Sequence, residues 1–388
     1  MRITMFYHSL LSDWNHGNAH FLRGIATELQ ARGHHVEVYE PRLGWSLQNL
    51  FAERGAQPLI DFQDAYPGLI STLYDPEYIN LDAALRDTDL VIVHEWNEPE
   101  LVTRIGEHHA ASAFSEGREY RLLFHDIHHR CVTDPQSLGR FDLSHYDGVL
   151  AFGDIVRELY LVYGWARRAW TWHEAADTRI FHPYYDVEPE GDLVWVGNWG
   201  DDERTAELQE FLIDPVRELR LQATVRGVRY PDSALRRLKH AKIRYGGWIA
   251  NYDVPRLFAA HRVTLHVLRR PYVQALPGIP TIRVFEAMAA GIPLVCSPWN
   301  DCEHLFSPGE DFLVARDKGE MKGHLRALLH DDAMARQLAT NARRTILARH
   351  TCAHRVDELL GICAELGLNT AVHTTRRADS CVLQGVFP

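Results

Sequence analysis

The sequence predicts an α/β protein built from two similar domains, each with a parallel sheet. The chain has 388 residues, which is too long for a typical single domain and enough for two separate cores. Short apolar runs alternate with amphipathic helical patterns in both halves, as in the βαβ units of a parallel sheet. Between the halves, residues 171–190 lose this pattern and are rich in proline, acidic and aromatic residues, which indicates a hinge.

The first domain is expected to span residues 1–170. It begins with a strand at residues 2–9, a helix over Phe21, Ile25 and Leu29, and a second strand at residues 36–40. Further buried strands are predicted at residues 89–94, 121–125 and 148–152. Polar residues stand at the ends of these strands, namely His8, His94, Glu95, His125 and Asp126. Because the carboxyl ends of parallel strands line the ligand crevice of open sheets, we expect these side chains there.

The second domain is expected to span residues 191–345. Its predicted strands are residues 193–197, 221–225, 243–246, 263–267 and 294–296. The helical pattern at residues 346–368 can pack back across the first domain, and the tail at residues 369–388 has no clear period. The fold class is therefore α/β, with two Rossmann-like domains facing each other across a cleft.

Composition limits the classes of partner. A net charge of −11 argues against a nucleic-acid surface. No window reaches the eighteen or so apolar residues of a membrane span, and the first residues run straight into a strand, so we expect a soluble cytoplasmic protein without an integral membrane segment. The six cysteines contain no CxxC pair, which favours reduced structural thiols over a disulfide or zinc framework.

One stretch of the second half combines a loop, a short helix and a buried strand. Pro277-Gly278 opens it, helix formers follow from Ile282 with Thr281 as a possible N-cap, and Gly291 ends the helix. The free amides at the start of such a helix favour an anion, most simply a phosphate. Glu286, one turn further in, can accept hydrogen bonds from hydroxyl groups. The alternative is that Arg283 and Glu286 form an ordinary surface ion pair on the helix.

Residues 281–297 resemble the donor-nucleotide segment of group 1 (family 4-like) glycosyltransferases, which have the GT-B fold. The stretches DCEHLFSPGEDFLVARD and NARRTILARHTCAHRVDELL continue the similarity. The resemblance implies that Glu286 binds the ribose hydroxyls of a nucleotide sugar, with Arg283 and Thr281 beside it. Many members carry a second glutamate eight positions earlier, where this chain has Gly278, so the amides of Gly278 and Ile279 are expected to replace that contact.

Two further loops of the second domain join the predicted donor site by the same resemblance. The loop after residues 193–197, with Asn198, is expected near the diphosphate, and Arg204, Arg226 or Arg229 can supply positive charge. For Arg204, an exposed ion pair on a helix is the alternative. Trp248 and Ile249 resemble the place where the base of the nucleotide stacks, although Trp248 can equally belong to the core.

In the first domain, His16, Gly17 and Asn18 open the first helix and form a candidate acceptor or phosphate loop, with His94 nearby. An ordinary turn capped by Asn18 is the alternative. The resemblance places His125 and Asp126 near the reacting centre, so these two residues and His16 are the candidate catalytic set. The run His125 to His129 also allows a metal site, or an aspartate cap followed by surface histidines.

The resulting expectation is a hexosyltransferase-like enzyme that moves a sugar from a nucleoside diphosphate sugar to an acceptor. Because arginines and helix N-termini can neutralise the leaving diphosphate, neither a metal ion nor a cofactor is expected. The alternatives are a non-catalytic nucleotide- or glycan-binding protein, a nucleotide-sugar epimerase of the same fold, and a metal-dependent hydrolase built on the histidine run.

Overall fold

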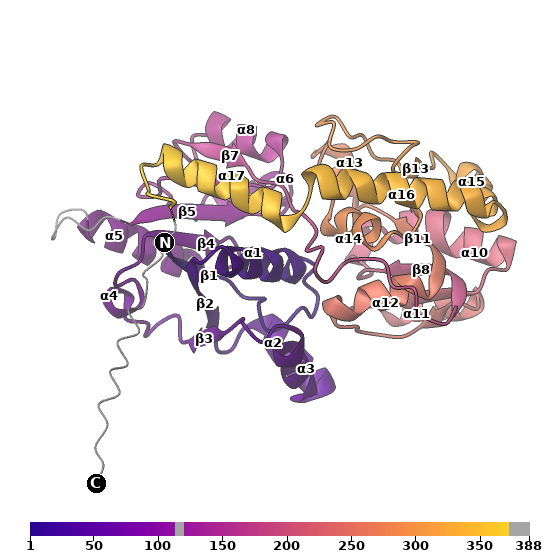
Figure 1. The fold of residues 1–388 in the computed structure, drawn as a ribbon, viewed down its shortest axis with the longest axis horizontal. Helices are drawn as coiled ribbons and strands as arrows, with labels where there is room; N and C mark the ends of the chain where they lie inside the picture. The colour runs from indigo at the N-terminus through magenta and orange to yellow at the C-terminus, as the bar shows by residue number, and fades with distance from the viewer. Residues whose placement is uncertain (113–119, 372–388) are drawn as a thin grey trace, which may run out of the picture.

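The computed structural model describes residues 1–112 and 120–371 and shows two lobes, each built around a parallel sheet with helices on its faces (Figure 1). Most of the predicted tail, from residue 372 onward, lies outside the described residues. Within the described part of the chain, no helix has the length and apolar character that a membrane crossing requires.

The first sheet has seven parallel strands in the order β3-β2-β1-β4-β5-β6-β7. The strands are β1 Arg2–Phe6, β2 His35–Pro41, β3 Ser71–Tyr74, β4 Leu90–His94, β5 Arg121–Asp126, β6 Gly148–Ala151 and β7 Ala169–Thr171. The helices are α1 Ala19–Ala31, α2 Trp45–Arg54, α3 Gln57–Ala65, α4 Leu81–Ala84, α5 Pro99–Ser112, α6 Arg130–Thr133, α7 Pro135–Leu138 and α8 Asp154–Val162. Alternate residues of β1 face opposite sides, so Ile3 and Met5 pack towards α1 while Phe6 packs towards α5.

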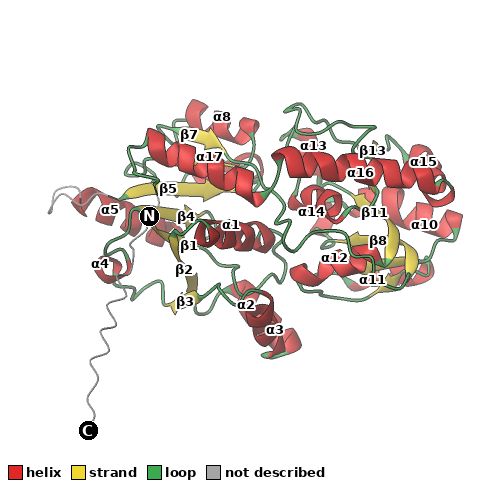
Figure 2. Cartoon of the chain, viewed as in Figure 1, coloured by secondary structure: helices red, strands yellow, loops and turns green. Residues whose placement is uncertain are grey.

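The second sheet has six parallel strands in the order β10-β9-β8-β11-β12-β13. Figure 2 shows the strands of this lobe in yellow with red helices around them. The strands are β8 Gly191–Val196, β9 Ala223–Arg226, β10 Arg244–Tyr245, β11 His261–His266, β12 Leu294–Cys296 and β13 Leu313–Val314. The α-helices are α9 Thr205–Leu208, α10 Asp214–Leu219, α11 Asp232–His240, α12 Val254–Ala259, α13 Arg270–Gln274, α14 Ile282–Ala290, α15 Lys318–His330, α16 Asp332–Arg349 and α17 Cys352–Glu365. Single turns of other helix types occupy Asp201–Glu203, Gln209–Ile213 and Asn251–Asp253.

Two segments pass between the lobes and are bonded to each other. The amide of Ala176, after β7, donates to the carbonyl of His350 at 3.0 Å, and the amide of Cys352 donates to Ala176 at 2.9 Å. Beyond this point α17 lies against α1 of the first lobe (Figure 1). The contact is close at Gly24, where an added Cβ would stand 2.4 Å from the Cys352 Sγ. Glycine is therefore required at this contact between the helices.

Candidate active site

The two lobes face each other along the carboxyl ends of their strands, as open α/β sheets generally place their ligands. A cleft of about 1180 Å³ lies there, with His16, Trp96 and His128 on the first lobe. Asn198, after β8, and the start of α14 line the opposite side. A neighbouring cavity of about 450 Å³ extends between residues 13–17 and residues 248–251.

The start of α14 projects into the larger cleft. Thr281, Ile282 and Arg283 all line it. Thr281 does not cap the helix as the sequence suggested, because its hydroxyl forms a 2.9 Å hydrogen bond with Nε2 of His266. Burial lowers the pKa of His266 to about 3, so this ring is neutral at physiological pH. The first turn of α14 therefore has no cap from the preceding residue, and the amide of Ile282 instead donates to the carboxyl of Glu174.

Gly278 adopts φ +89°, a conformation that side chains disfavour. A Cβ at this position would lie 2.7 Å from Sγ of Cys302 and 2.9 Å from Cγ of Glu303, so a glutamate does not fit here. The Gly278 amide donates to the carbonyl of Asn300 at 2.9 Å. That amide is already used, which contradicts its expected role as a replacement donor, while the Ile279 side chain is buried against Gly153.

Glu286 is completely buried and lies at the contact between the lobes. Its Oε1 accepts hydrogen bonds from Nδ1 of His20 at 3.0 Å and Nδ2 of Asn251 at 2.7 Å, and its Oε2 pairs with Arg283. The amide of Asp177 donates to Nε2 of His20 at 2.6 Å, which places the imidazole proton on Nδ1. Burial opposes ionisation, but Arg283, His20 and Asn251 together hold the pKa of Glu286 below its ordinary value.

The Arg283–Glu286 pair therefore exists but is buried, unlike the surface pair that the sequence left open. Glu286 does not line either cavity, whereas Arg283 lines both. In this arrangement Oε1 is engaged by two hydrogen bonds and Oε2 only by the ion pair with Arg283, and the role of the carboxylate towards a ribose stays a prediction.

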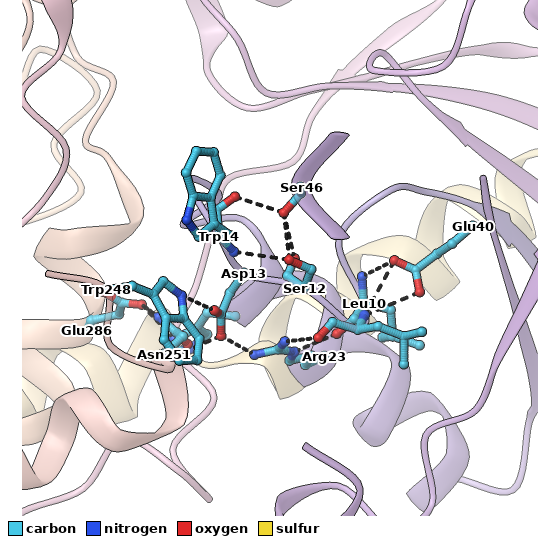
Figure 3. Close-up of polar contacts among 12 residues, drawn as sticks. Leu10, Ser12, Asp13, Trp14, Arg23, Glu40, Ser46, Trp248, Asn251 and Glu286 are labelled. Carbon is cyan, nitrogen blue, oxygen red and sulfur yellow. Dashed lines mark hydrogen bonds and ion pairs between the residues drawn. The ribbon is translucent and has the colours of Figure 1, made fainter. Parts of the chain in front are cut away.

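Asp13 fixes the second lobe to the loop after β1 (Figure 3). Its Oδ1 accepts from the indole nitrogen of Trp248 at 3.0 Å, and its Oδ2 accepts from the Asn251 amide at 2.9 Å. Nη1 of the buried Arg23 donates to the same Oδ2 at 2.9 Å. Asp13 therefore joins two lobes through one carboxylate, and the ion pair with Arg23 offsets the cost of burying it.

Trp248 and Ile249 line the smaller cavity, together with Asn198. The Trp248 ring is half-buried and also packs against Trp14, Leu50 and Val228. It therefore combines the two roles that the sequence left open, being part of a small apolar cluster and a wall of the cavity. Asn198 is held by the first lobe, since its Nδ2 bonds Oδ1 of Asn15 at 2.5 Å.

Four arginines line the larger cleft: Arg204, Arg229, Arg269 and Arg283. Arg229 pairs with Asp201 at 3.1 Å, and Arg269 with Glu203 at 2.9 Å. Arg204 differs, because it donates to the carbonyls of Val267 at 3.0 Å, Trp199 and Asn198.

No carboxylate within the described ranges forms an ion pair with Arg204, contrary to the surface pair that the sequence allowed. Its enclosed position, and then the charge of Arg269, lower the pKa of Arg204 to about 9, so it remains a cation at neutral pH. Arg226 lines neither cavity and donates instead to the carbonyl of Gly246.

The predicted loop that opens α1 lines the cleft. His16 and Gly17 line both cavities, and Asn18 lines the larger one. Asn18 makes no side-chain cap to α1, and its Nδ2 instead contacts Nε2 of the buried His94 at 3.2 Å. Burial lowers the pKa of His16 to about 4, which makes it a neutral imidazole.

His125 and Asp126 are fully buried beneath the cleft and line neither cavity. Nδ1 of His125 bonds the Tyr7 hydroxyl at 2.7 Å, and burial lowers the pKa of His125 to about 3. Asp126 accepts from the Tyr160 hydroxyl at 2.8 Å and from the His128 amide at 2.9 Å. The structure thus places these two candidate catalytic groups in the core.

The next residues along the chain, His128 and His129, are the ones that reach the cleft. Among the residues described, no group of three or more histidine, cysteine or acidic side chains is arranged to hold a metal ion.

Sequence reasoning missed Asp13, His20 and Glu174, all of which act where distant segments meet. His20 lies on α1 and Glu174 follows β7, and neither belongs to a recognisable motif. Asp13 was the most accessible to prediction, because an acidic residue in the loop after the first strand lies at the expected crevice.

Comparisons with known proteins agree with this geometry. Residues 204–361 match the family model described as glycosyl transferase-like. No curated protein matches the chain. The predicted resemblance to glycosyltransferases is therefore confirmed over the region that holds α14 and its strand.

Solved GT-B structures match nearly the whole chain. Sucrose-phosphate synthase from Thermosynechococcus elongatus aligns with a TM-score of 0.63 at 14% identity, covering 95% of this chain and 99% of that one. HepE from Anabaena, in complex with UDP and glucose, gives 0.66 at 13%, covering 94% and 99%. An alpha-glucosyltransferase in complex with UDP and DNA gives 0.67 at 11%, again covering 94% and 99%. The fold is thus the predicted GT-B fold.

Proposed function

We propose that the protein is a glycosyltransferase that moves a sugar from a nucleoside diphosphate sugar to an acceptor. The donor is held mainly by the second lobe and the acceptor mainly by the first. The match of residues 204–361 to a glycosyl transferase-like family and the similarity to structures that contain UDP or UDP-glucose support the proposal.

The observation that carries it is the charge of the cleft. Arg204 has no carboxylate partner among residues 1–112 and 120–371, and it lines the same space as Arg283 and the start of α14. A dianionic diphosphate placed there would accept charge-assisted hydrogen bonds from arginine and be stabilised by the positive end of the helix dipole. These groups stabilise the leaving diphosphate in the transition state, so the proposed reaction needs no metal ion.

In this proposal the smaller cavity receives the base. Trp248 and Ile249 line it, and Asp13 fixes their loop from the opposite lobe. His16, Trp96, His128 and His129 line the first-lobe side, where an acceptor would lie. Because burial lowers the pKa of His16 to about 4 and that of His128 to about 2, both rings are neutral at physiological pH and can accept a hydrogen bond from an acceptor hydroxyl.

Thermal unfolding of the purified protein with UDP, GDP, ADP and their glucose conjugates, each with and without a chelator, tests the donor site. A ligand at about a hundred times its dissociation constant stabilises a protein by about 2.7 kcal/mol, which shifts the midpoint by a few degrees. A shift with one nucleotide that survives chelation supports the proposal. The absence of any shift would refute it.

Binding alone does not separate an enzyme from a nucleotide-binding protein of the same fold. Release of the nucleoside diphosphate from the bound donor, followed with a panel of sugar and lipid acceptors, makes that distinction. Binding without release in the presence of every acceptor favours the binding protein, and loss of activity on chelation that a divalent ion restores contradicts the metal-free mechanism.

A further inference from the structure

Among the described residues that line the larger cleft, Glu174 is the single carboxylic acid. It lies in the segment that leaves β7 for the second lobe, and its carbonyl accepts from Nε of Arg355 at 3.4 Å. The residue is only 7% exposed, and it lines the cleft. An acid in a cleft that four arginines and several histidines also line is unusual enough to require an explanation.

We propose that Glu174 contacts the sugar of the donor, hydrogen-bonding its hydroxyl groups at the point where the diphosphate ends. This inference rests on the proposed function and extends it to the recognition of the sugar. Glu174 is close to Ile282 and Arg283 in the first turn of α14, where the proposed diphosphate binds. A group beside that turn, on the opposite lobe, meets whatever is attached to the terminal phosphate.

The Ile282 amide donates a hydrogen bond to the Glu174 carboxyl, and the rest of that carboxyl is left available to a ligand. Its charged neighbours are Glu286 and Arg283, both on α14, and within the described ranges no side chain donates a hydrogen bond to it. The other buried acids near the cleft differ in this respect. Glu286 has three side-chain partners, and Glu303 accepts from the Asp154 amide at 2.9 Å and from Nε2 of His173 at 2.6 Å.

The protonation state of Glu174 suits a site next to a diphosphate. Burial, and then the charge of Glu286, raise its pKa to about 8, although the Ile282 amide and Arg283 act in the opposite direction. At neutral pH the group is mostly a neutral acid, so it does not repel the phosphates. It can both donate to one sugar hydroxyl and accept from another.

The need for such a group follows from Gly278. No side chain fits at that position, and the Gly278 amide is bonded to Asn300. The loop before α14 therefore offers little polar contact to a sugar, and Glu174 supplies it from the other lobe.

The test compares the affinities of UDP and UDP-glucose, or of whichever pair the wild-type protein binds from the panel above. Truncation by Glu174→Ala removes the sugar contact and leaves the base and phosphate contacts in place. We expect the affinity for the nucleotide sugar to fall roughly tenfold to a hundredfold, the cost of one or two lost hydrogen bonds, while that for the free diphosphate changes less than threefold. Glu174→Gln, which keeps the shape and both hydrogen-bonding capacities, should recover part of the loss.

Glu188→Ala is the matched control, because Glu188 is an exposed glutamate in the same connecting segment. Equal losses for the nucleotide sugar and the diphosphate in Glu174→Ala would show a structural role and overturn the inference. Unchanged affinity for both would also overturn it. If the wild-type protein binds no member of the panel, the proposed function itself fails, which is a different result from failure at Glu174.

Discussion

Replacing Glu286 by alanine should weaken the contacts between the two lobes as well as donor binding. The substitution removes the acceptor for His20 and Asn251 and leaves the 15% exposed Arg283 without its partner. Each buried polar group left without its hydrogen-bond partner costs about 1–3 kcal/mol, and removing one member of a buried ion pair costs about 3–5 kcal/mol. These costs overlap, so we expect a total of about 3–5 kcal/mol in the free energy of unfolding.

Urea unfolding followed by tryptophan fluorescence measures this loss. The exposed Glu310, changed to alanine, is the matched control and should alter the free energy of unfolding by less than about 0.5 kcal/mol. Glu286→Gln keeps the shape and one acceptor, so its loss should be intermediate. If Glu286→Ala were as stable as the control, the buried network would not be stabilising the protein.

The pH dependence of the same experiment follows from the lowered pKa of Glu286. The folded protein holds this carboxyl ionised at a lower pH than the unfolded chain does. Its contribution is therefore present above the usual carboxylate pKa of about 4.5 and is lost as the pH falls below it. The difference between wild type and Glu286→Gln should shrink on acidification, and a difference that grew instead would contradict the assignment.

Three further predictions test other parts of the structure. Arg204→Ala should weaken diphosphate binding by roughly tenfold to a hundredfold in calorimetry, while Arg236→Ala, at an exposed arginine of α11, leaves it unchanged. Gly24→Val should destabilise the protein by about 1–3 kcal/mol or more in thermal unfolding, because its side chain overlaps Cys352; normal stability would show that α17 does not pack there. The pKa of Glu174 is about 8 in the folded protein and near 4.5 in the unfolded chain. Its contribution to stability is therefore complete below pH 4.5 and is lost as the pH rises through 8, so the wild type should lose stability relative to Glu174→Gln over that window.

The strands and helices could largely be predicted from the sequence, because they depend on patterns of neighbouring residues. The apolar runs at residues 89–94 and 121–125 became β4 and β5, and the helix after Gly278 became α14. The strands that were missed are short or lie at an edge. β3 lies at an edge and has one buried residue among four, while β7 and β13 have three and two residues, too few to show any period.

The candidate site was only partly accessible, since its chemistry depends on burial and on contacts between lobes. The sequence indicates that His125 and Asp126 end a strand, and the structure confirms this for β5. It does not indicate that the chain turns at that point so that these two side chains are buried and His128 faces the cleft. A strand end identifies the edge of the sheet, but the loop conformation decides which residue meets the substrate.

The contacts between the lobes link binding to conformation. Asp13 and Asn15 of the first lobe hold Trp248 and Asn198 of the proposed donor site, and His20 holds Glu286, which pairs with the cleft-lining Arg283. A donor that binds Trp248 or Arg283 therefore touches residues whose positions depend on closure of the cleft. A ligand can stabilise a closed arrangement of the lobes only to the extent that it binds the closed arrangement more tightly than an open one. If the proposed donor binds there, the acids that join the lobes and the cations that line the cleft would couple donor binding to the assembly of the acceptor side, which is the order a transferase needs if water is to be kept from the bound sugar.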